Sequence, residues 1–217
     1  MKIEDIVNLT EGTLTNTPKV QAIQGASVYY SKIEHGDLFF SSSQEEIDQA
    51  IENGAYAIVY ADDSIVKKDD EIAWIKVSDL QLAAIKLIRY VTIKKEAKFF
   101  LLSEHELTFL KMILVHKSNI KFITDEWKKA FEHILNSDCS LFVGADKALL
   151  ELIKPDVSKL KKEVDGYAVS DTLFRTTFKV GGFVYQEKEL IPFHLEYLLR
   201  VIDFCDTQEL DYSVERL

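Results

Sequence analysis

Side chains that could do chemistry are few in this chain, and the densest group of them is Glu104-His105-Glu106. Imidazole and carboxylate groups are common metal ligands, so this run is a candidate metal site. Three consecutive residues at the start of a helix point in different directions, which works against a shared ion. Ser103 precedes the run, and a serine followed three residues later by a glutamate is the capping-box pattern of a helix N-terminus. The pattern therefore predicts a capped helix and no metal site.

The candidate nucleophiles and bases stand apart from one another. Cys139 and Cys205 lie far apart in apolar surroundings, which is typical of a reduced, cytoplasmic chain. Asp138 precedes Cys139, and a neighbouring carboxylate disfavours the thiolate that a catalytic cysteine needs. His116 and His133 are single histidines near expected helix ends. We therefore expect no catalytic residue, no metal ligand and no cofactor.

The charge balance narrows the classes of partner. The 217 residues include 36 acidic and 26 basic side chains, which gives a net charge of -10, and 47% of them are hydrophobic. Nucleic acid and anionic membrane surfaces repel a uniformly acidic protein, so neither is expected as a partner. The first residues, Met1-Lys2-Ile3-Glu4-Asp5, include charged side chains and no apolar core segment, so we expect no signal peptide. No apolar stretch reaches the ~18 residues that a membrane span requires. We expect a cytoplasmic protein.

Hydrophobic periodicity predicts a small α/β domain over residues 1–93. Asn53-Gly54 is expected to end one helix, since glycine takes the left-handed C-cap conformation without a steric penalty. Ser78 or Asp79 is expected to cap another. The expected strands are 20–23, 27–30, 38–40, 56–60 and 73–77, and the expected helices begin near residues 3, 44 and 80.

A second α/β domain is predicted over residues 94–164. Lys94-Lys95-Glu96 is a short charged joint, after which the pattern starts again. Strands that alternate with helices pair in parallel, so a parallel sheet is expected here. The expected strands are 98–102, 120–123 and 140–143. Two expected helices are capped by Ser103 and Asp125, and a third runs from Asp146 to Ile153.

The pattern changes over residues 165–217. The runs 173–180 and 183–190 alternate around Gly181-Gly182, a turn signal for a β-hairpin. Pro192 opens a last helix, and the residues after Thr207 are expected to fray. The predicted fold class is α/β, with two small α/β domains, a largely parallel sheet in the second, and a C-terminal β-hairpin and helix.

Residues 1–93 resemble the N-terminal domain of the Mur ligases, of the kind that adds the third residue or the D-Ala-D-Ala dipeptide to the muramyl peptide. The resemblance rests on Gly36-Asp37-Leu38-Phe39, Ala50-Ile51, Gly54-Ala55, Ala57-Ile58-Val59 and the helix entry from Val77 to Tyr90. It implies a domain descended from one that holds the uridine-diphosphate end of the substrate. Further on, Asp138 to Gly144 and Glu151 to Val157 resemble a strand, a helix and a Pro-Asp stop of the family's central domain. Residues 165–217 do not resemble the family's C-terminal domain.

The resemblance implies an ATP site that this chain has lost. The family binds ATP through Gly-x-x-Gly-Lys-Thr/Ser, whose glycines let backbone N–H groups surround the phosphates while the lysine supplies charge. Ser103 to Thr108 stands at that place without glycine or lysine and with two glutamates. The family's metal-holding glutamate falls near Phe142, which cannot ligate magnesium. Residues 94–164 are therefore expected to be a degenerate Rossmann-like, P-loop-derived domain that does not bind ATP.

The family's contacts to the uridine diphosphate are also altered. Its aspartate-serine-arginine motif falls on Tyr29, Tyr30 and Ser31, and its glycine-rich, histidine-containing loop is replaced by Ser41, Ser42 and Ser43. Phosphate recognition without arginine or those backbone donors is poor. By resemblance alone, the candidate ligand-contacting residues are Tyr29, Tyr30, Ser31, Ser41 and Ser42, and a UDP-sugar stays open as a ligand. The alternative is that Ser43 simply caps the following helix.

Large aromatic residues are dense near the C-terminus and suggest an interface. The candidates are Phe174, Phe183, Tyr185 and Tyr197. They either cover the second domain or form a surface for a protein partner or a second copy of the chain.

Three hypotheses for function follow. The first is a non-catalytic Mur-ligase-like protein that acts as a binding or regulatory module linked to peptidoglycan precursor synthesis. The second is a small-molecule binder or enzyme with a rebuilt site in the cleft between the domains, and the third is a structural homodimer subunit. Fold resemblance alone does not choose among them.

Overall fold

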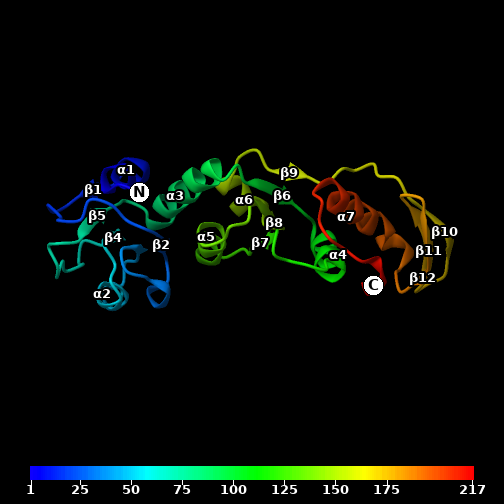
Figure 1. The fold of residues 1–217 in the computed structure, drawn as a ribbon, viewed down its shortest axis with the longest axis horizontal. Coiled ribbons are helices and arrows are strands. Elements are labelled where there is room, and N and C mark those ends of the chain that lie inside the picture. The colour runs from blue at the N-terminus through cyan, green and yellow to red at the C-terminus, as the bar shows by residue number, and fades with distance from the viewer. The chain divides into compact units, whose positions relative to one another are not determined.

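The computed structural model describes all residues from 1 to 217, and the chain forms two compact units (Figure 1). Unit 1 comprises residues 1–96 and 126–138, and unit 2 comprises residues 97–125 and 139–217. The chain therefore leaves unit 2 once to contribute one helix to unit 1. The domain boundaries at 93/94 and 164/165 stay a prediction. No helix combines the length and apolar character that crossing a membrane requires.

Unit 1 is built on a five-stranded sheet in the order β1-β5-β4-β3-β2. Strands β2 to β5 run parallel, and the two-residue β1 pairs antiparallel with β5. Every residue of β3 and β4 is buried, as expected for parallel strands that are covered on both faces. The strands are β1 (Thr13–Leu14), β2 (Ala26–Ser27), β3 (Leu38–Phe40), β4 (Ala57–Tyr60) and β5 (Ala73–Lys76), and the helices are α1 (Ile3–Thr10), α2 (Gln44–Glu52) and α3 (Leu80–Lys94).

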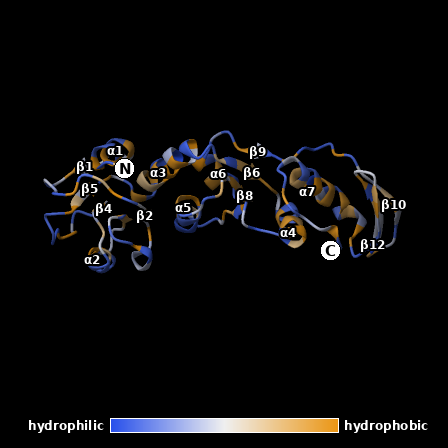
Figure 2. Ribbon diagram, in the orientation of Figure 1, coloured by the Kyte–Doolittle hydropathy of each residue, from blue (hydrophilic) through white to orange (hydrophobic).

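The helices of unit 1 start and end where the sequence predicts. Ser43 accepts a hydrogen bond from the Glu46 N–H at the start of α2, and Asp79 accepts one from the Leu82 N–H at the start of α3. Gly54 follows α2 with a φ of 98°, the left-handed region that favours glycine. Figure 2 shows orange and blue stretches on the same helices, the amphipathic pattern from which they were predicted.

Two predicted strands of unit 1 are wrong. Residues 20–23 contribute only an isolated bridge from Ala22 to Lys2, and of residues 27–30 only Ser27 is in a strand. The chain instead turns into a short 3₁₀ helix, Tyr30–Lys32. The reason is local: the Tyr29 N–H donates to Ser27 Oγ, and the Val28 N–H donates to the Glu132 carboxylate, so side chains replace the ladder partners.

The helix α5 (Trp127–Leu135) is the segment that the chain contributes to unit 1. Phe131 is fully buried and makes an edge contact with Phe40, with ring centroids 5.3 Å apart. At the other end, Lys95 Nζ donates to the carbonyls of Ile134 and Ser137, at 2.9 and 2.6 Å. The predicted cap at Asp125 is wrong, because the helix begins one residue later, after Glu126, without a side-chain cap.

The first part of unit 2 is a four-stranded parallel sheet in the order β7-β8-β6-β9. This confirms the parallel sheet predicted for this half of the chain. The capping box at Ser103 is also confirmed, and Asp146 caps the helix that was expected to begin there. The strands are β6 (Lys98–Leu101), β7 (Lys121–Phe122), β8 (Leu141–Gly144) and β9 (Ser158–Lys159), and the helices are α4 (Glu104–Ile113) and α6 (Lys147–Ile153).

The second part of unit 2 is an antiparallel meander followed by α7 (Leu195–Thr207), which a 3₁₀ turn from Pro192 to His194 precedes. The meander strands are β10 (Tyr167–Asp171), β11 (Thr176–Val180) and β12 (Phe183–Lys188). The hairpin at Gly181-Gly182 is confirmed, with φ values of 55° and 87° that suit glycine. The sequence prediction missed β10. Phe178 is fully buried in a core that also contains side chains of α4 and α7.

The prediction of a frayed C-terminus is wrong. Leu210 and Val214 belong to the core of unit 2, and the chain ends in a 3₁₀ turn, Val214–Arg216. The Ser213 N–H donates to the Ile113 carbonyl, and Tyr212 forms a bridge with Leu114. Leu210 and Val214 are apolar and four residues apart, a spacing that indicates burial on one side of the chain and that the sequence analysis did not use.

Candidate functional site

The candidate site is the N-terminus of α4, directly after the carboxyl end of β6. In parallel α/β sheets this edge is where ligands bind, and the backbone N–H groups of a helix N-terminus attract anions. Here the Glu106 carboxylate lies beside that position. The Ser103 N–H and Ser103 Oγ both donate to Glu106 Oε2, at 2.7 and 2.8 Å, and the Glu106 N–H donates back to Ser103 Oγ. Glu106 is 6% exposed, so the carboxylate acts as a built-in anion.

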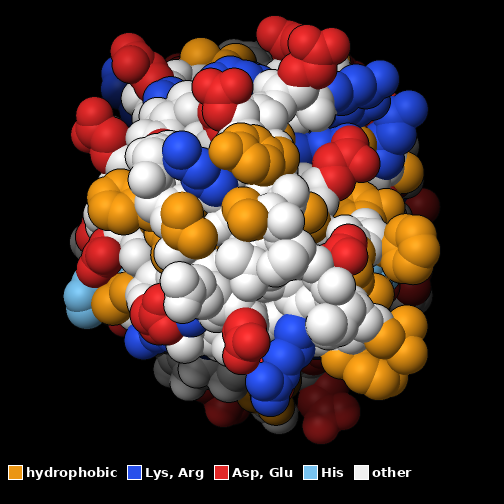
Figure 3. All heavy atoms as spheres, turned by 90° about the vertical axis from the view of Figure 1, so that its right-hand side faces the viewer, with side chains coloured by type: hydrophobic (Ala, Val, Ile, Leu, Met, Phe, Trp, Pro, Cys, Tyr) orange, Lys and Arg blue, Asp and Glu red, His pale blue; other side chains and the backbone are white.

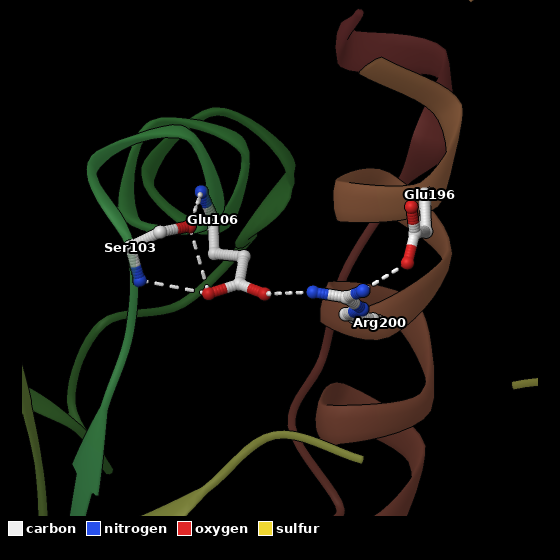
Figure 4. A network of polar contacts seen from close by, with 4 residues as sticks. All are labelled: Ser103, Glu106, Glu196 and Arg200. Atoms are coloured by element: carbon white, nitrogen blue, oxygen red, sulfur yellow. Dashed lines mark hydrogen bonds and ion pairs between the residues drawn. The ribbon is translucent and has the colours of Figure 1, made fainter. Parts of the chain in front are cut away.

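Arg200 of α7 completes the network (Figure 4). Its Nη1 lies 3.4 Å from Glu106 Oε1, and its Nη2 bonds to Glu196 one turn earlier on the same helix. The Arg200 Nε is buried without a hydrogen-bond partner. The guanidinium charge is therefore directed at two carboxylates of the protein and is not offered to a ligand.

Two features of this geometry would work against a phosphate bound at the start of α4. The Ser103 N–H at the helix start is already used by a carboxylate, and an incoming phosphate would meet the charge of Glu106. Phe142 lies fully buried in β8 and stacks on Phe99, with ring centroids 5.0 Å apart. The His105 ring packs at a tilt against the rings of His194 and Tyr197. No three His, Cys, Asp or Glu side chains of the structure lie close enough together to hold a metal ion.

The candidate ligand-contacting residues lie at the carboxyl ends of β2 and β3 in unit 1. Ser41 Oγ donates to Glu46 at 2.5 Å and accepts from the Ser43 N–H, so this hydroxyl stabilises the start of α2. Ser42 Oγ accepts from the Ala61 N–H at 3.3 Å. Tyr29, Tyr30 and Ser31 lie in the turn after β2, and Tyr30 and Ser31 are exposed. The topology thus brings the two groups to one sheet edge, where the serine hydroxyls already have partners.

The four candidate interface residues divide into two pairs. Tyr185 stacks on Phe178, with ring centroids 5.2 Å apart, and Tyr197 packs at a tilt against His105 at 5.0 Å, so both rings make contacts inside unit 2. Phe174 and Phe183 are 68% and 69% exposed. The structure therefore leaves the second pair available to a partner.

Two residues of functional interest escaped the sequence analysis. Arg200 gave only the signal of an i, i+4 pair with Glu196, and nothing connects it to Glu106, 94 residues earlier. No feature of the sequence marked Glu132. It is 4% exposed and accepts hydrogen bonds from Ser27 Oγ, the Val28 N–H and Asn136 Nδ2.

No family model and no curated protein matches this sequence. Solved structures do. MurF from Acinetobacter baumannii matches with a TM-score of 0.59 and 12% identity over 99% of this chain and 66% of its own. A second A. baumannii structure, named as the UDP-N-acetylmuramoylalanyl-D-glutamyl-2,6-diaminopimelate–D-alanyl-D-alanyl ligase, matches with a TM-score of 0.59 and 11% identity over the same shares of the two chains.

MurF ligase from Thermotoga maritima in complex with ADP matches with a TM-score of 0.59 and 13% identity over 89% of this chain and 65% of its own. This protein therefore has a Mur-ligase-like fold. It spans about two-thirds of the length of these ligases.

Proposed function

We propose that this protein is a non-catalytic protein of Mur-ligase-like fold that acts as a binding or regulatory module linked to peptidoglycan precursor synthesis. One observation supports the proposal above all: the buried Glu106 carboxylate places a negative charge beside the helix N-terminus at which a nucleotide phosphate would need to bind. An ion pair with Arg200 and a capping box with Ser103 hold it there. The link to peptidoglycan rests on the likeness in fold to MurF.

Titration of the full chain with magnesium-ATP tests the loss of nucleotide binding. A ligand at about 100 times its Kd raises the stability of the folded state by roughly 2.7 kcal/mol, which a thermal-shift measurement detects. We expect no shift with magnesium-ATP. A saturable rise in melting temperature would overturn the proposal, since it would require a phosphate site despite Glu106.

UDP-N-acetylglucosamine is the second ligand in the same measurement. The hydroxyl groups of Ser41 and Ser42 already form hydrogen bonds with neighbouring groups, so we expect no shift in melting temperature with this ligand either. A shift with the UDP-sugar alone would leave the protein non-catalytic and make it a sensor of that ligand.

A protein partner or a second copy of the chain is the binding target that the surface favours. Of the large hydrophobic side chains that are exposed, most lie between residues 167 and 193, including Phe174 and Phe183. Figure 3, which faces this end of unit 2, shows orange side chains interspersed with charged ones. Exposed apolar groups rimmed by polar ones are typical of protein interaction sites.

The variants Phe174→Asp and Phe183→Asp test this surface. Both side chains are exposed, so the fold should tolerate the change, whereas complexes or dimers that use the surface should dissociate. Light scattering after size exclusion measures the mass. Val66→Asp, at an exposed apolar position of unit 1, is the matched control. A purified complex or dimer that survives both phenylalanine variants would contradict this use of the surface.

A further inference from the structure

Unit 1 contains two adjoining cavities that lie apart from the candidate ligand-contacting serines. The larger is about 650 Å³ and the smaller about 350 Å³. Both are lined by Gln24 to Ala26, which lead into β2, and by Leu135 and Asn136 at the end of α5. Because these residues precede β2 and the larger cavity also reaches Asp37 before β3, the cavities open at the amino ends of these parallel strands. Ser41 and Ser42 follow the carboxyl end of β3.

The larger cavity carries an excess of negative charge. It is lined by the carboxylates of Glu34, Asp37 and Asp138. Its one lysine, Lys32, lies 3.5 Å from the buried Glu132 and is thereby neutralised. Neither Glu34 nor Asp138 takes part in an ion pair of the structure, and both are exposed to solvent in the cavity.

The other polar groups of this cavity leave that excess in place. His35 Nε2 is paired with the Tyr56 hydroxyl at 2.8 Å, and the Asp37 Oδ2 accepts a hydrogen bond from the Glu34 N–H at 3.0 Å. The C-terminal end of α5 is the negative end of the helix dipole, and Lys95 offsets part of it. The cavity therefore favours a cationic group.

The smaller cavity is walled mainly by apolar side chains. Ile23 and Leu87 are almost completely buried, and Tyr90 and Val91 of α3 complete the wall. The side-chain charges of Asp5 and Lys94, which both lie on it, balance each other, and the Met1 ammonium, which also lines it, donates to the Ile23 carbonyl at 2.9 Å. The Lys94 ammonium sits 4.7 Å above the Tyr90 ring. Transfer of an apolar group from water into this cavity is therefore favourable.

We propose that the two cavities form one binding site for an amphiphilic amine, a small molecule with a primary ammonium group on an apolar body. The ammonium would lie in the larger cavity near Glu34 and Asp138, and the body in the smaller one against Tyr90 and Val91. Cavities of roughly 300 to 1,000 Å³ are the usual size for small-molecule sites. The site lies wholly in unit 1, so it does not depend on the proposed loss of ATP binding in unit 2.

Four small probes test the charge and the body separately. The full ¹⁵N-labelled chain is titrated with 2-phenylethylamine, and amide shifts of Gly25, Ala26 and Asn136 are followed. We expect saturable shifts with this probe, at least tenfold weaker binding of 3-phenylpropionate, which reverses the charge, and weaker binding of ethylamine, which lacks the body. Inorganic phosphate should shift none of these amides.

The double variant Glu34→Gln with Asp138→Asn removes two charges from the cavity. It should weaken the binding of 2-phenylethylamine at least fivefold. The matched control is Glu52→Gln with Asp70→Asn, two exposed carboxylates of unit 1 outside both cavities, which should change binding less than twofold. No saturable shift with 2-phenylethylamine, equal binding of the carboxylate probe, or equal losses in the two double variants would each overturn the proposal.

Discussion

Glu132 in unit 1 and Glu106 in unit 2 are both helical, both nearly inaccessible to solvent, and both surrounded by serine hydroxyl and backbone N–H donors. They differ in how far along the chain the serine that donates to each of them lies. The serine of Glu106 is three residues away, whereas that of Glu132 is 105 residues away. A buried carboxylate with local donors completes a helix end, and one with distant donors attaches a helix to a strand.

The two glutamates also differ in how their charge is balanced. Glu106 lies 3.4 Å from Arg200, which is itself largely buried, whereas Glu132 lies 3.5 Å from Lys32, which is exposed. Burial strengthens an ion pair and makes the loss of one partner more costly. We therefore expect Glu132 to hold α5 in place chiefly through its hydrogen bonds. We expect Glu106 to act at the start of α4 chiefly through its charge.

The largest effect is expected for Glu132→Ala. It leaves the Val28 N–H buried without a partner, removes one of the hydrogen bonds of Ser27 Oγ and breaks the ion pair with Lys32. We therefore expect a loss of about 3 kcal/mol in the stability of unit 1. Trp74 and Trp127 both belong to unit 1, so tryptophan fluorescence during denaturant unfolding reports it. The matched control is Glu126→Ala, which removes only an exposed pair with Lys129 and should cost at most about 0.5 kcal/mol. Equal losses in the two variants would remove the distinction between the glutamates.

Glu106→Ala comes next and sharpens the comparison, because it should convert an occupied helix N-terminus into an open one. Loss of the capping box and of the ion pair should cost unit 2 about 2 kcal/mol. Inorganic phosphate should then recover part of the loss by binding between the Ser103 N–H and Arg200. Hydrogen exchange of the α4 amides, with and without phosphate, measures both effects.

Glu104→Ala changes an exposed residue of the same helical turn and is the control for Glu106→Ala; phosphate should not affect its stability. If phosphate protects the wild-type chain and the Glu106 variant equally, Glu106 does not occupy an anion site.

Local signals account for what the sequence predicts of this molecule. The capping box at Ser103 and Glu106 lies within one helical turn, and the Gly181-Gly182 turn requires only positive φ values that glycine supplies. The parallel sheet of unit 2 follows from alternating strands and helices. In each case the residues that determine the structure are close neighbours in the chain.

The contacts that escaped prediction are those between distant residues. Arg200 meets Glu106 only because α7 packs beside α4, and Glu132 meets Ser27 only because α5 returns to unit 1. The missed β10 is exposed along its whole length, so no apolar alternation marks it. Such features depend on the packing of whole elements, which periodicity within one element does not reveal.

Alkaline pH should destabilise unit 2 through Cys205. Burial, with a smaller contribution from Asp206, raises the pKa of this thiol from 9.0 to about 12. A raised folded-state pKa means that the stabilisation is fully present below pH 9 and is lost as the pH rises toward 12. At pH 10, one unit above the pKa of the thiol in the unfolded state, the free energy of unfolding should be lower by about 1.4 kcal/mol.

Cys205→Ala should flatten the pH dependence of unit 2 unfolding above pH 9, whatever it costs at neutral pH. The same slope in the variant and the wild type would assign the alkaline loss to other groups. Tyr212, whose pKa is raised by burial and by its hydrogen bond to Asp206, is the next candidate.

The smallest effect, about 1 kcal/mol, is expected for Lys95→Met, which removes the ammonium that caps the C-terminus of α5. The helix-end carbonyls can turn to water once the ammonium is gone, so the loss should be well below that of Glu132→Ala. Lys94→Met, which removes only the ammonium above Tyr90, is the matched control and should cost about 0.5 kcal/mol. If Lys95→Met instead matches Glu132→Ala in tryptophan-monitored unfolding, α5 is held chiefly by its C-terminal cap. The long-range contacts of Glu132 would then be a consequence of docking, and the contrast with Glu106 would rest on charge alone.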